Sequence, residues 1–179
     1  FFNMTFSMPD CIVVGIANVD RRRDFTFPTT VSDLKKKYPT TGHSEAFNRF
    51  IETELLPFID KQYKTNSTRY LIGQSLGGLL ATEILLKKSA LFSHYLIVSP
   101  SLWWDDETLL KAAPALLAKQ DLSGIFVYMS VGKGEDSIMQ QDASQLYSLL
   151  QKMDKRSPVT TWKLMVDDNH ATILHRSLY

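Results

Sequence analysis

The stretch of residues 68–86, TRYLIGQSLGGLLATEILL, contains the pattern of residues from which the fold class can be inferred. Its first part, Thr68–Ile72, is a short apolar run that predicts a strand, and its second part predicts a helix from about Leu76 to Lys87. Between them, Gly73–Gly77 (GQSLG) fits the pattern G-x-S-x-G. A strand that passes through this pattern directly into a helix must turn sharply. We expect both glycines to remove side chains that would collide with neighbouring backbone.

The serine in this turn is the candidate nucleophile. At such a turn the Ser75 hydroxyl stands clear of the sheet, at the N-terminus of the following helix. The Leu76 backbone N–H and the positive end of the helix dipole can then stabilise a developing oxyanion. The motif alone is a weak indicator of function, and the strand before it and the helix after it make it a stronger one. It favours acyl transfer at Ser75 over the alternative, a glycine-rich turn without chemistry.

Strands and helices alternate on both sides of the motif. Buried strands are predicted at Cys11–Ala17, Tyr95–Val98 and Ile125–Val131, and an outer strand at Pro158–Val166. Helices are predicted at Ser44–Tyr63, with a kink or break at Pro57, and at Asp106–Lys119, Ser137–Lys152 and Ala171–Tyr179, whereas Asp20–Pro39 is predicted to be a long loop. This alternation implies βαβ units. We expect an α/β fold, a three-layer sandwich with a mostly parallel sheet, as a single domain over residues 1–179.

Bulk composition excludes several classes of function. The 179 residues are 44% hydrophobic and carry a net charge of +1, which argues against nucleic-acid or membrane partners. The single cysteine, Cys11, excludes an internal disulfide framework and a cysteine zinc site, and we expect it to be buried. No phosphate-binding glycine loop or metal spacing occurs, so we expect no cofactor and no metal. We expect a soluble protein, cytoplasmic or periplasmic, of undetermined oligomeric state.

A serine nucleophile needs a base, and the loop after the last predicted strand supplies the best candidate. His170 follows Asp167–Asn169 there, at the carboxyl edge of the sheet where Ser75 also lies. His175, about a turn inside the last helix, and His43, in a polar loop before the nucleophile, remain alternatives. His94 starts a strand and is expected to be structural.

The acid should follow the strand Ile125–Val131, because the chain order in this kind of fold is nucleophile, acid, histidine. The loop Gly132–Asp136 supplies two adjacent carboxylates, Glu135 and Asp136. One of these carboxylates could accept the histidine Nδ1–H and hold the productive tautomer, while the other points to solvent or caps the next helix. Alternatively, both carboxylates could serve only as helix caps. The residues alone do not separate them. Asp167 and Asp168 are too close in sequence to His170 to be favoured.

Taken together, these residues resemble the esterase family that contains enterochelin (ferric siderophore) esterases, S-formylglutathione hydrolases and feruloyl esterases. The matching stretches cover most of the chain: Ile12–Asp20 with Arg21–Asp24, Phe50–Ile59, Ile72–Leu79, Ser99–Trp104 and Asn169–His170. The resemblance implies an α/β-hydrolase fold and hydrolysis of an ester or thioester without a cofactor. The Ser99–Trp104 stretch is most similar to the siderophore-esterase branch.

The resemblance also bears on the acid and on the ends of the chain. Family acids often stand three residues after the glycine that ends the strand, which favours Glu135, although some siderophore esterases use a serine–histidine pair alone. Family members usually have a hairpin and an oxyanion-forming turn before the stretch matching Ile12–Asp20, and only eleven residues precede Ile12. We therefore expect the chain to lack N-terminal strands and the end of the last helix, or to have a reduced site. Only Leu76 can be assigned as an oxyanion donor.

Two further features bear on the substrate. Trp103 and Trp104 follow a strand end and could form a wall for an aromatic or catecholate group, although one of them could instead close the core. The run Arg21–Arg23 is expected to leave a strand at its carboxyl end, where Arg22 and Arg23 could attract an anionic substrate. A solvated loop is an equally good interpretation of the arginines.

The sequence therefore predicts a serine esterase that acts on a small-molecule ester through an acyl-enzyme. A siderophore-type ester is the first expectation, and a simple carboxylic, feruloyl or thioester the second. An acyltransferase, which uses the same acyl-enzyme, and an inactive hydrolase fold used for binding are the alternatives.

Overall fold

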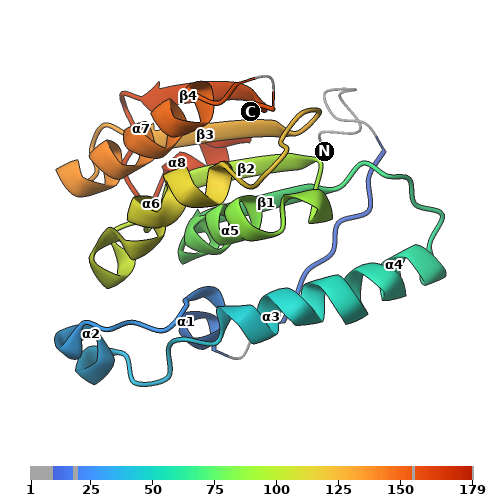
Figure 1. Cartoon of the computed structure of the whole chain (residues 1–179), viewed down its shortest axis with the longest axis horizontal. Helices are drawn as coiled ribbons and strands as arrows, with labels where there is room; N and C mark the ends of the chain where they lie inside the picture. Colours follow the sequence, from blue (N-terminus) through green and yellow to red (C-terminus); the bar gives the residue numbers. More distant parts are fainter. Residues whose placement is uncertain (1–9, 18–19, 155, 179) are drawn as a thin grey trace.

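The computed structural model describes residues 10–17, 20–154 and 156–178. Its centre is a four-stranded, all-parallel sheet in the order β1-β2-β3-β4 (Figure 1). The strands are β1 (Tyr70–Ser75), β2 (His94–Pro100), β3 (Phe126–Gly132) and β4 (Val159–Met165). Each predicted strand from residue 68 onwards is confirmed to within a few residues. Because all four strands are parallel, their carboxyl ends share one edge of the sheet.

Helices lie on both faces of the sheet, as expected. One face carries α5 (Leu76–Lys87), α6 (Trp104–Leu117) and α7 (Ser137–Gln151), and the short α8 (Ile173–Ser177) lies behind the strands in the view of Figure 1. A 3-10 turn, η2 (Ser89–Leu91), links α5 to β2. The predicted helix at the end of the chain runs to Tyr179, which lies outside the described residues. Within the described residues, no helix is long and apolar enough to cross a membrane.

The core lies between the sheet and the α5–α7 layer. Nine consecutive residues of α5, Gly78–Leu86, are buried, as are the inward side chains of the central strands, among them Tyr95, Ile97, Val127 and Met129. A helix that is apolar on nearly all sides needs such burial, and the apolar area removed from water stabilises the fold. This packing fixes α5, and therefore Ser75 at its beginning, rigidly against the sheet.

A separate layer of helices lies along the edge of the core: α1 (Arg21–Phe25), α2 (Ser32–Lys37), α3 (Ser44–Phe50), the π-helix η1 (Ile51–Leu55) and α4 (Leu56–Gln62) (Figure 1). The predicted kink or break at Pro57 takes the form of a change in hydrogen bonding: Pro57 stands in the first turn of α4, directly after η1, and the backbone stays helical across the junction at Leu55 and Leu56. Proline has no backbone N–H to donate, so the hydrogen-bond pattern changes at this point.

Several expectations about the N-terminal region are wrong. Residues 10–17 form neither strand nor helix, and Val13 is 84% exposed, so the predicted buried strand Cys11–Ala17 is absent and Cys11 itself is exposed. An apolar, β-branched run favours a strand, but pairing with a neighbouring strand decides whether one forms. Here the segment lines a cavity of about 630 Å³ beside α4 and the start of β1 instead of joining the sheet.

The predicted loop Asp20–Pro39 contains the two short helices α1 and α2. Consequently the arginine run does not leave a strand but forms the beginning of α1. The Asp20 carboxylate caps this helix by accepting a hydrogen bond from Arg23 N at 3.0 Å.

Candidate active site

Ser75 occupies a strained turn at the junction of β1 and α5. Its backbone has φ 61° and ψ −121°, a conformation that residues other than glycine rarely adopt. Gly73 makes the turn possible, because a Cβ there would lie 2.1 Å from the Gly77 carbonyl oxygen. The expectation for the second motif glycine is wrong, since a Cβ on Gly77 would meet nothing within 4 Å. The next glycine, Gly78, is the one that packs closely, with its ideal Cβ 2.9 Å from Pro100 Cα.

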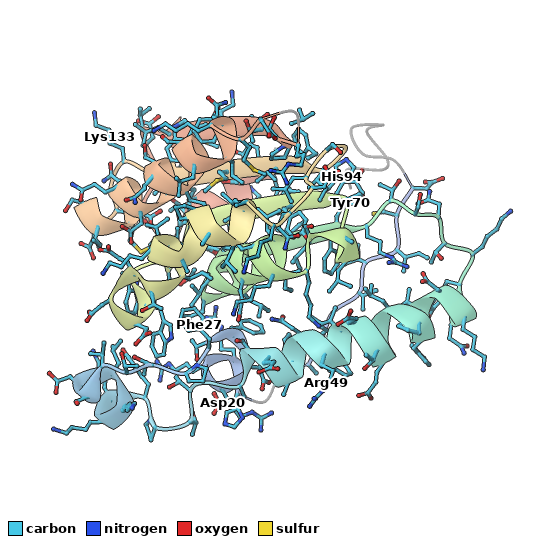
Figure 2. All side chains as sticks on the ribbon, in the orientation of Figure 1. Asp20, Phe27, Arg49, Tyr70, His94 and Lys133 are labelled. Carbon is cyan, nitrogen blue, oxygen red and sulfur yellow. The ribbon has the colours of Figure 1, made fainter. Side chains whose placement is uncertain are left out.

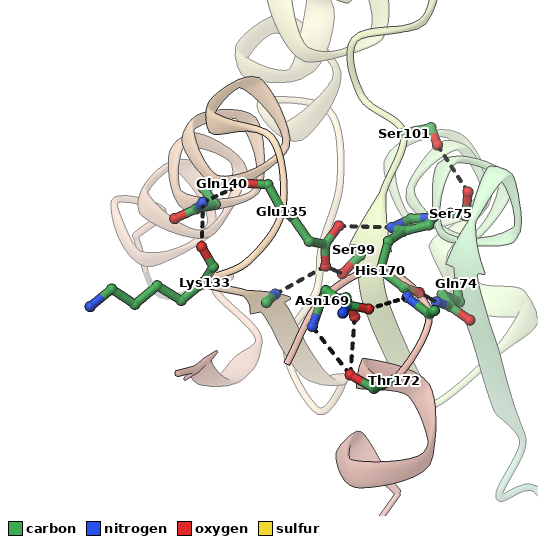
Figure 3. Close-up of polar contacts among 12 residues, drawn as sticks. Gln74, Ser75, Ser99, Ser101, Lys133, Glu135, Gln140, Asn169, His170 and Thr172 are labelled. Carbon is green, nitrogen blue, oxygen red and sulfur yellow. Dashed lines mark hydrogen bonds and ion pairs between the residues drawn. The ribbon is translucent and has the colours of Figure 1, made fainter. Parts of the chain in front are cut away.

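The loop after β3 presents Glu135, not Asp136, to the candidate base. Glu135 Oε2 lies 2.8 Å from His170 Nδ1, and the glutamate side chain is 1% exposed. Its other oxygen, Oε1, accepts hydrogen bonds from Gly132 N at 3.0 Å and from Ser99 Oγ (Figure 3). Asp136 is exposed and stands at the N-cap position of α7. With Nδ1–H donated to Glu135, His170 Nε2 is free to accept a proton.

Hydrogen bonds to its backbone carbonyl oxygens join the histidine loop to its neighbours. Gln74 Nε2 donates to the His170 carbonyl oxygen at 2.6 Å, which ties the loop to the residue before Ser75. Gly134 N donates to the Asp168 carbonyl oxygen at 3.0 Å, which ties it to the acid loop. A Cβ on Gly132 would stand 2.6 Å from the same Asp168 oxygen, so the two loops can approach this closely only with glycine there.

The His170 ring lies between Glu135 and Ser75 (Figure 3). Among the described residues, however, Ser75 Oγ makes no hydrogen bond to His170; its neighbour is Ser101 Oγ at 3.4 Å. Contacts between nucleophile and base are often long without substrate and tighten when it binds. The three side chains therefore lie in the order acid, base, nucleophile. The acid–base hydrogen bond is formed, and the hydrogen bond between base and nucleophile is not.

The other three histidines lie elsewhere in the fold. His94 starts β2 at the opposite edge of the sheet, with its ring 4.5 Å from that of Tyr70, and the two are neighbours in Figure 2. His43 is the N-cap residue of α3, and its backbone N–H donates to the Arg23 carbonyl oxygen at 2.9 Å. His175 lies on α8. The contact with Glu135 distinguishes His170 from these alternatives.

A cavity of about 490 Å³ opens beside Ser75. It is lined by Ser75, Leu76, Ser101, Trp103 and Trp104 from the sheet edge, and by Asp20, Arg21, Arg22, Thr26, Tyr38 and Thr41 from the α1–α2 region. The Leu76 residue expected to donate its N–H is thus at the cavity wall. Ser75 and Leu76 thus both line a space large enough for a small ligand.

The two tryptophans differ in their surroundings. Trp104 is 1% exposed and its indole N–H donates to the Phe27 carbonyl oxygen at 2.9 Å, so most of its surface belongs to the core. Trp103 is only partly buried, with its ring 6.2 Å from that of Trp104. Trp103 is therefore the tryptophan with more surface to offer a ligand.

The three arginines of α1 also differ in whether they line the cavity. Arg21 and Arg22 line the cavity, and the Arg22 guanidinium lies 4.8 Å from the Tyr38 ring centroid. Arg23 is not among the lining residues and pairs with Asp24 at 2.8 Å. Opposing negative charge comes from Asp20, whose pKa is lowered chiefly by the Arg23 backbone N–H. The cavity mouth thus has two arginines against one carboxylate.

Sequence reasoning missed Ser99, Gln74 and Ser101. Gln74 occupies a variable position of G-x-S-x-G, and the two serines flank Pro100 in a stretch quoted only for its family resemblance. No local pattern shows that these side chains meet Glu135, His170 and Ser75. Their positions depend on how three strand ends come together.

Comparisons with known proteins show which family the chain belongs to. The model of the Esterase family, described as "Putative esterase", matches residues 5–172. The ferri-bacillibactin esterase BesA of Bacillus subtilis is 32% identical over 165 residues, which cover 86% of this chain and 57% of the relative. The siderophore triacetylfusarinine C esterase of Aspergillus fumigatus is 30% identical over 58% of this chain and 35% of its own length.

Solved structures show the same similarity. An IroE-like serine hydrolase from Shewanella oneidensis superposes with a TM-score of 0.80 at 30% identity, over 90% of this chain and 55% of that one. The BES protein from Bacillus cereus gives a TM-score of 0.78 at 30% identity, over 88% and 60% respectively. The chain thus spans between about half and two thirds of the length of BesA and of these two proteins. Because the family model covers nearly all of its residues, the chain belongs to the esterase family.

Proposed function

We propose that this chain carries the active site of a serine esterase, with Ser75 as nucleophile, His170 as base and Glu135 as acid. The observation that carries the proposal is the hydrogen-bonded Glu135–His170 pair at 2.8 Å, beside a serine held at a positive φ between strand and helix. A buried carboxylate on Nδ1 fixes the tautomer in which Nε2 can take a proton. Relatives named as esterases support the same chemistry.

The reaction is a two-step acyl transfer. Ser75 Oγ attacks the ester carbonyl carbon while its proton passes to His170 Nε2, and the carbonyl oxygen becomes an oxyanion. The Leu76 N–H at the beginning of α5 faces this charge. The carbon–oxygen bond to the alcohol then breaks, and His170 gives its proton to the departing alcohol. Water attacks the acyl-enzyme by the same steps in reverse and releases the acid and Ser75.

We further propose that the substrate is a siderophore-type ester that carries negative charge near the scissile bond. Two of the relatives are named as esterases of siderophores, and Arg21 and Arg22 line the cavity beside Ser75. Arginine stays charged and can bind carboxylate or catecholate oxygens through two N–H groups. The partly buried Trp103 offers an aromatic surface in the same cavity.

The test is a panel of esters that includes ferric siderophores, feruloyl esters and neutral nitrophenyl esters. Wild-type protein should hydrolyse at least one class, and Ser75→Ala should hydrolyse none. Arg22→Ala should raise KM for anionic esters and leave neutral esters almost unchanged, and added salt should shrink the difference. Arg23→Ala is the matched control, since Arg23 does not line the cavity. Equal KM changes for both ester types would overturn the charge proposal, and turnover by Ser75→Ala would overturn the esterase site.

A further inference from the structure

Ser99 stands at an irregularity in the central sheet. Gln74 pairs with Val98 and Ser75 pairs with Pro100, so Ser99 between them has no partner on β1. This is a β-bulge, a device that redirects a side chain and is frequent beside active sites. Ser99 also has a backbone φ of 42° and is fully buried. A serine in this sparsely populated region is held there by its surroundings.

The bulge directs the Ser99 hydroxyl to the carboxylate of Glu135. Ser99 Oγ and Gly132 N both donate to Glu135 Oε1, while Oε2 faces His170 Nδ1 at 2.8 Å (Figure 3). One carboxylate oxygen is thus engaged by two donors from two strands. The carboxylate can rotate away from His170 only by breaking both bonds.

We propose that Ser99 is a positioning residue that fixes the Glu135 carboxylate so that Oε2 meets His170. The inference rests on the proposed esterase function, because it assigns a role to Ser99 through the acid of that site. Hydrogen bonds to charged groups contribute more than those between neutral groups, and the site is buried at both ends of this contact. Removing the hydroxyl leaves one donor on Oε1 and frees the carboxylate to turn.

The test is a double-mutant cycle between Ser99→Gly and Glu135→Ala. Glycine removes the hydroxyl and accepts the positive φ without strain. In the wild-type background, Ser99→Gly should lower kcat for a neutral ester by about tenfold, with KM unchanged. In the Glu135→Ala background it should change kcat by less than about twofold, because the hydroxyl then has no carboxylate to hold. Ser130→Ala, which removes another fully buried strand hydroxyl, is the matched control and should leave kcat unchanged.

Each outcome decides the question. Equal losses in both backgrounds, or wild-type kcat in Ser99→Gly, would overturn the proposal. Should Ser99→Gly not fold, Ser99→Ala takes its place in the cycle, and loss of folding in both while Ser130→Ala stays folded would make Ser99 a structural support only. Turnover that survives Ser75→Ala would instead overturn the proposed function itself, so the two failures are distinguishable.

Discussion

A Glu135→Gln substitution keeps the size and shape of the side chain but changes what its two terminal atoms can do. Because Ser99 Oγ and Gly132 N both donate to Oε1, the amide oxygen of the glutamine must take that position. The amide nitrogen, which can only donate, then stands where Oε2 now lies 2.8 Å from His170 Nδ1. The imidazole can accept this bond only through an unprotonated Nδ1, which places its own proton on Nε2.

With Nε2 already protonated, His170 cannot take the proton of Ser75. In serine-protease triads the corresponding change lowers kcat by about 10⁴, which corresponds to about 5.4 kcal/mol in the barrier. The His170 side chain is 47% exposed, so water can hydrogen-bond to the ring and keep a fraction of the molecules in the productive tautomer. We therefore expect kcat to fall by about 10³ to 10⁴.

The assay is the steady-state hydrolysis of a neutral nitrophenyl ester, with circular dichroism as the folding control. The histidine tautomer can be read from the ¹⁵N chemical shifts of His170. Asp136→Asn is the matched control, because Asp136 is exposed and, among the described residues, its side chain caps no helix N–H. A Glu135→Gln protein that keeps more than about a tenth of wild-type kcat, or an equal loss in Asp136→Asn, would refute the reasoning.

Four other substitutions test the motif glycines, the histidine loop and the buried carboxylate of α7. Gly73→Ala should abolish folding or activity, because its Cβ would lie 2.1 Å from the Gly77 carbonyl oxygen, whereas Gly77→Ala, with nothing within 4 Å, should fold normally in circular dichroism. Gln74→Leu should lower kcat by about tenfold at unchanged stability, since the 2.6 Å bond to the His170 carbonyl oxygen is lost; wild-type kcat would contradict this. Burial raises the pKa of Asp142 to about 6, so its charged form destabilises the fold above that pH and the penalty vanishes towards pH 3.8. Asp142→Asn should therefore raise the free energy of unfolding by about 1 to 3 kcal/mol at pH 7.5 and by less than about 1 kcal/mol at pH 4, and an equal gain at both pH values in urea unfolding would argue against this cause.

The fold was predictable wherever local pattern and tertiary packing agree. The helix predicted from Leu76 to Lys87 is found at those bounds. The G-x-S-x-G turn fixes where it begins, and its apolar residues require that it pack against the sheet. The strand predicted at Cys11–Ala17 is not found, because its composition favours a strand but pairing with a neighbour is a tertiary event. The α1 helix was missed because it is too short to show a periodic pattern.

The candidate site was predictable in its order along the chain but not in its detailed contacts. The sequence places Ser75, Glu135 and His170 at or after the ends of three strands, β1, β3 and β4, and parallel pairing brings those ends to one edge. The contact of Glu135 with Ser99 depends on a bulge, which shifts the pairing by one residue and leaves no signature in the sequence. The same holds for Gln74, whose side chain meets a backbone oxygen far along the chain.

Covalent labelling reports on whether Ser75 is the nucleophile of an assembled site without requiring that the natural substrate be known. The folded protein should be treated with a fluorophosphonate probe, digested, and analysed by peptide mass spectrometry. We expect a single phosphonyl adduct on Ser75, which is lost in Ser75→Ala and forms much more slowly in His170→Ala. An adduct on Ser101, whose hydroxyl lies 3.4 Å from that of Ser75, or no adduct in a folded protein, would contradict it.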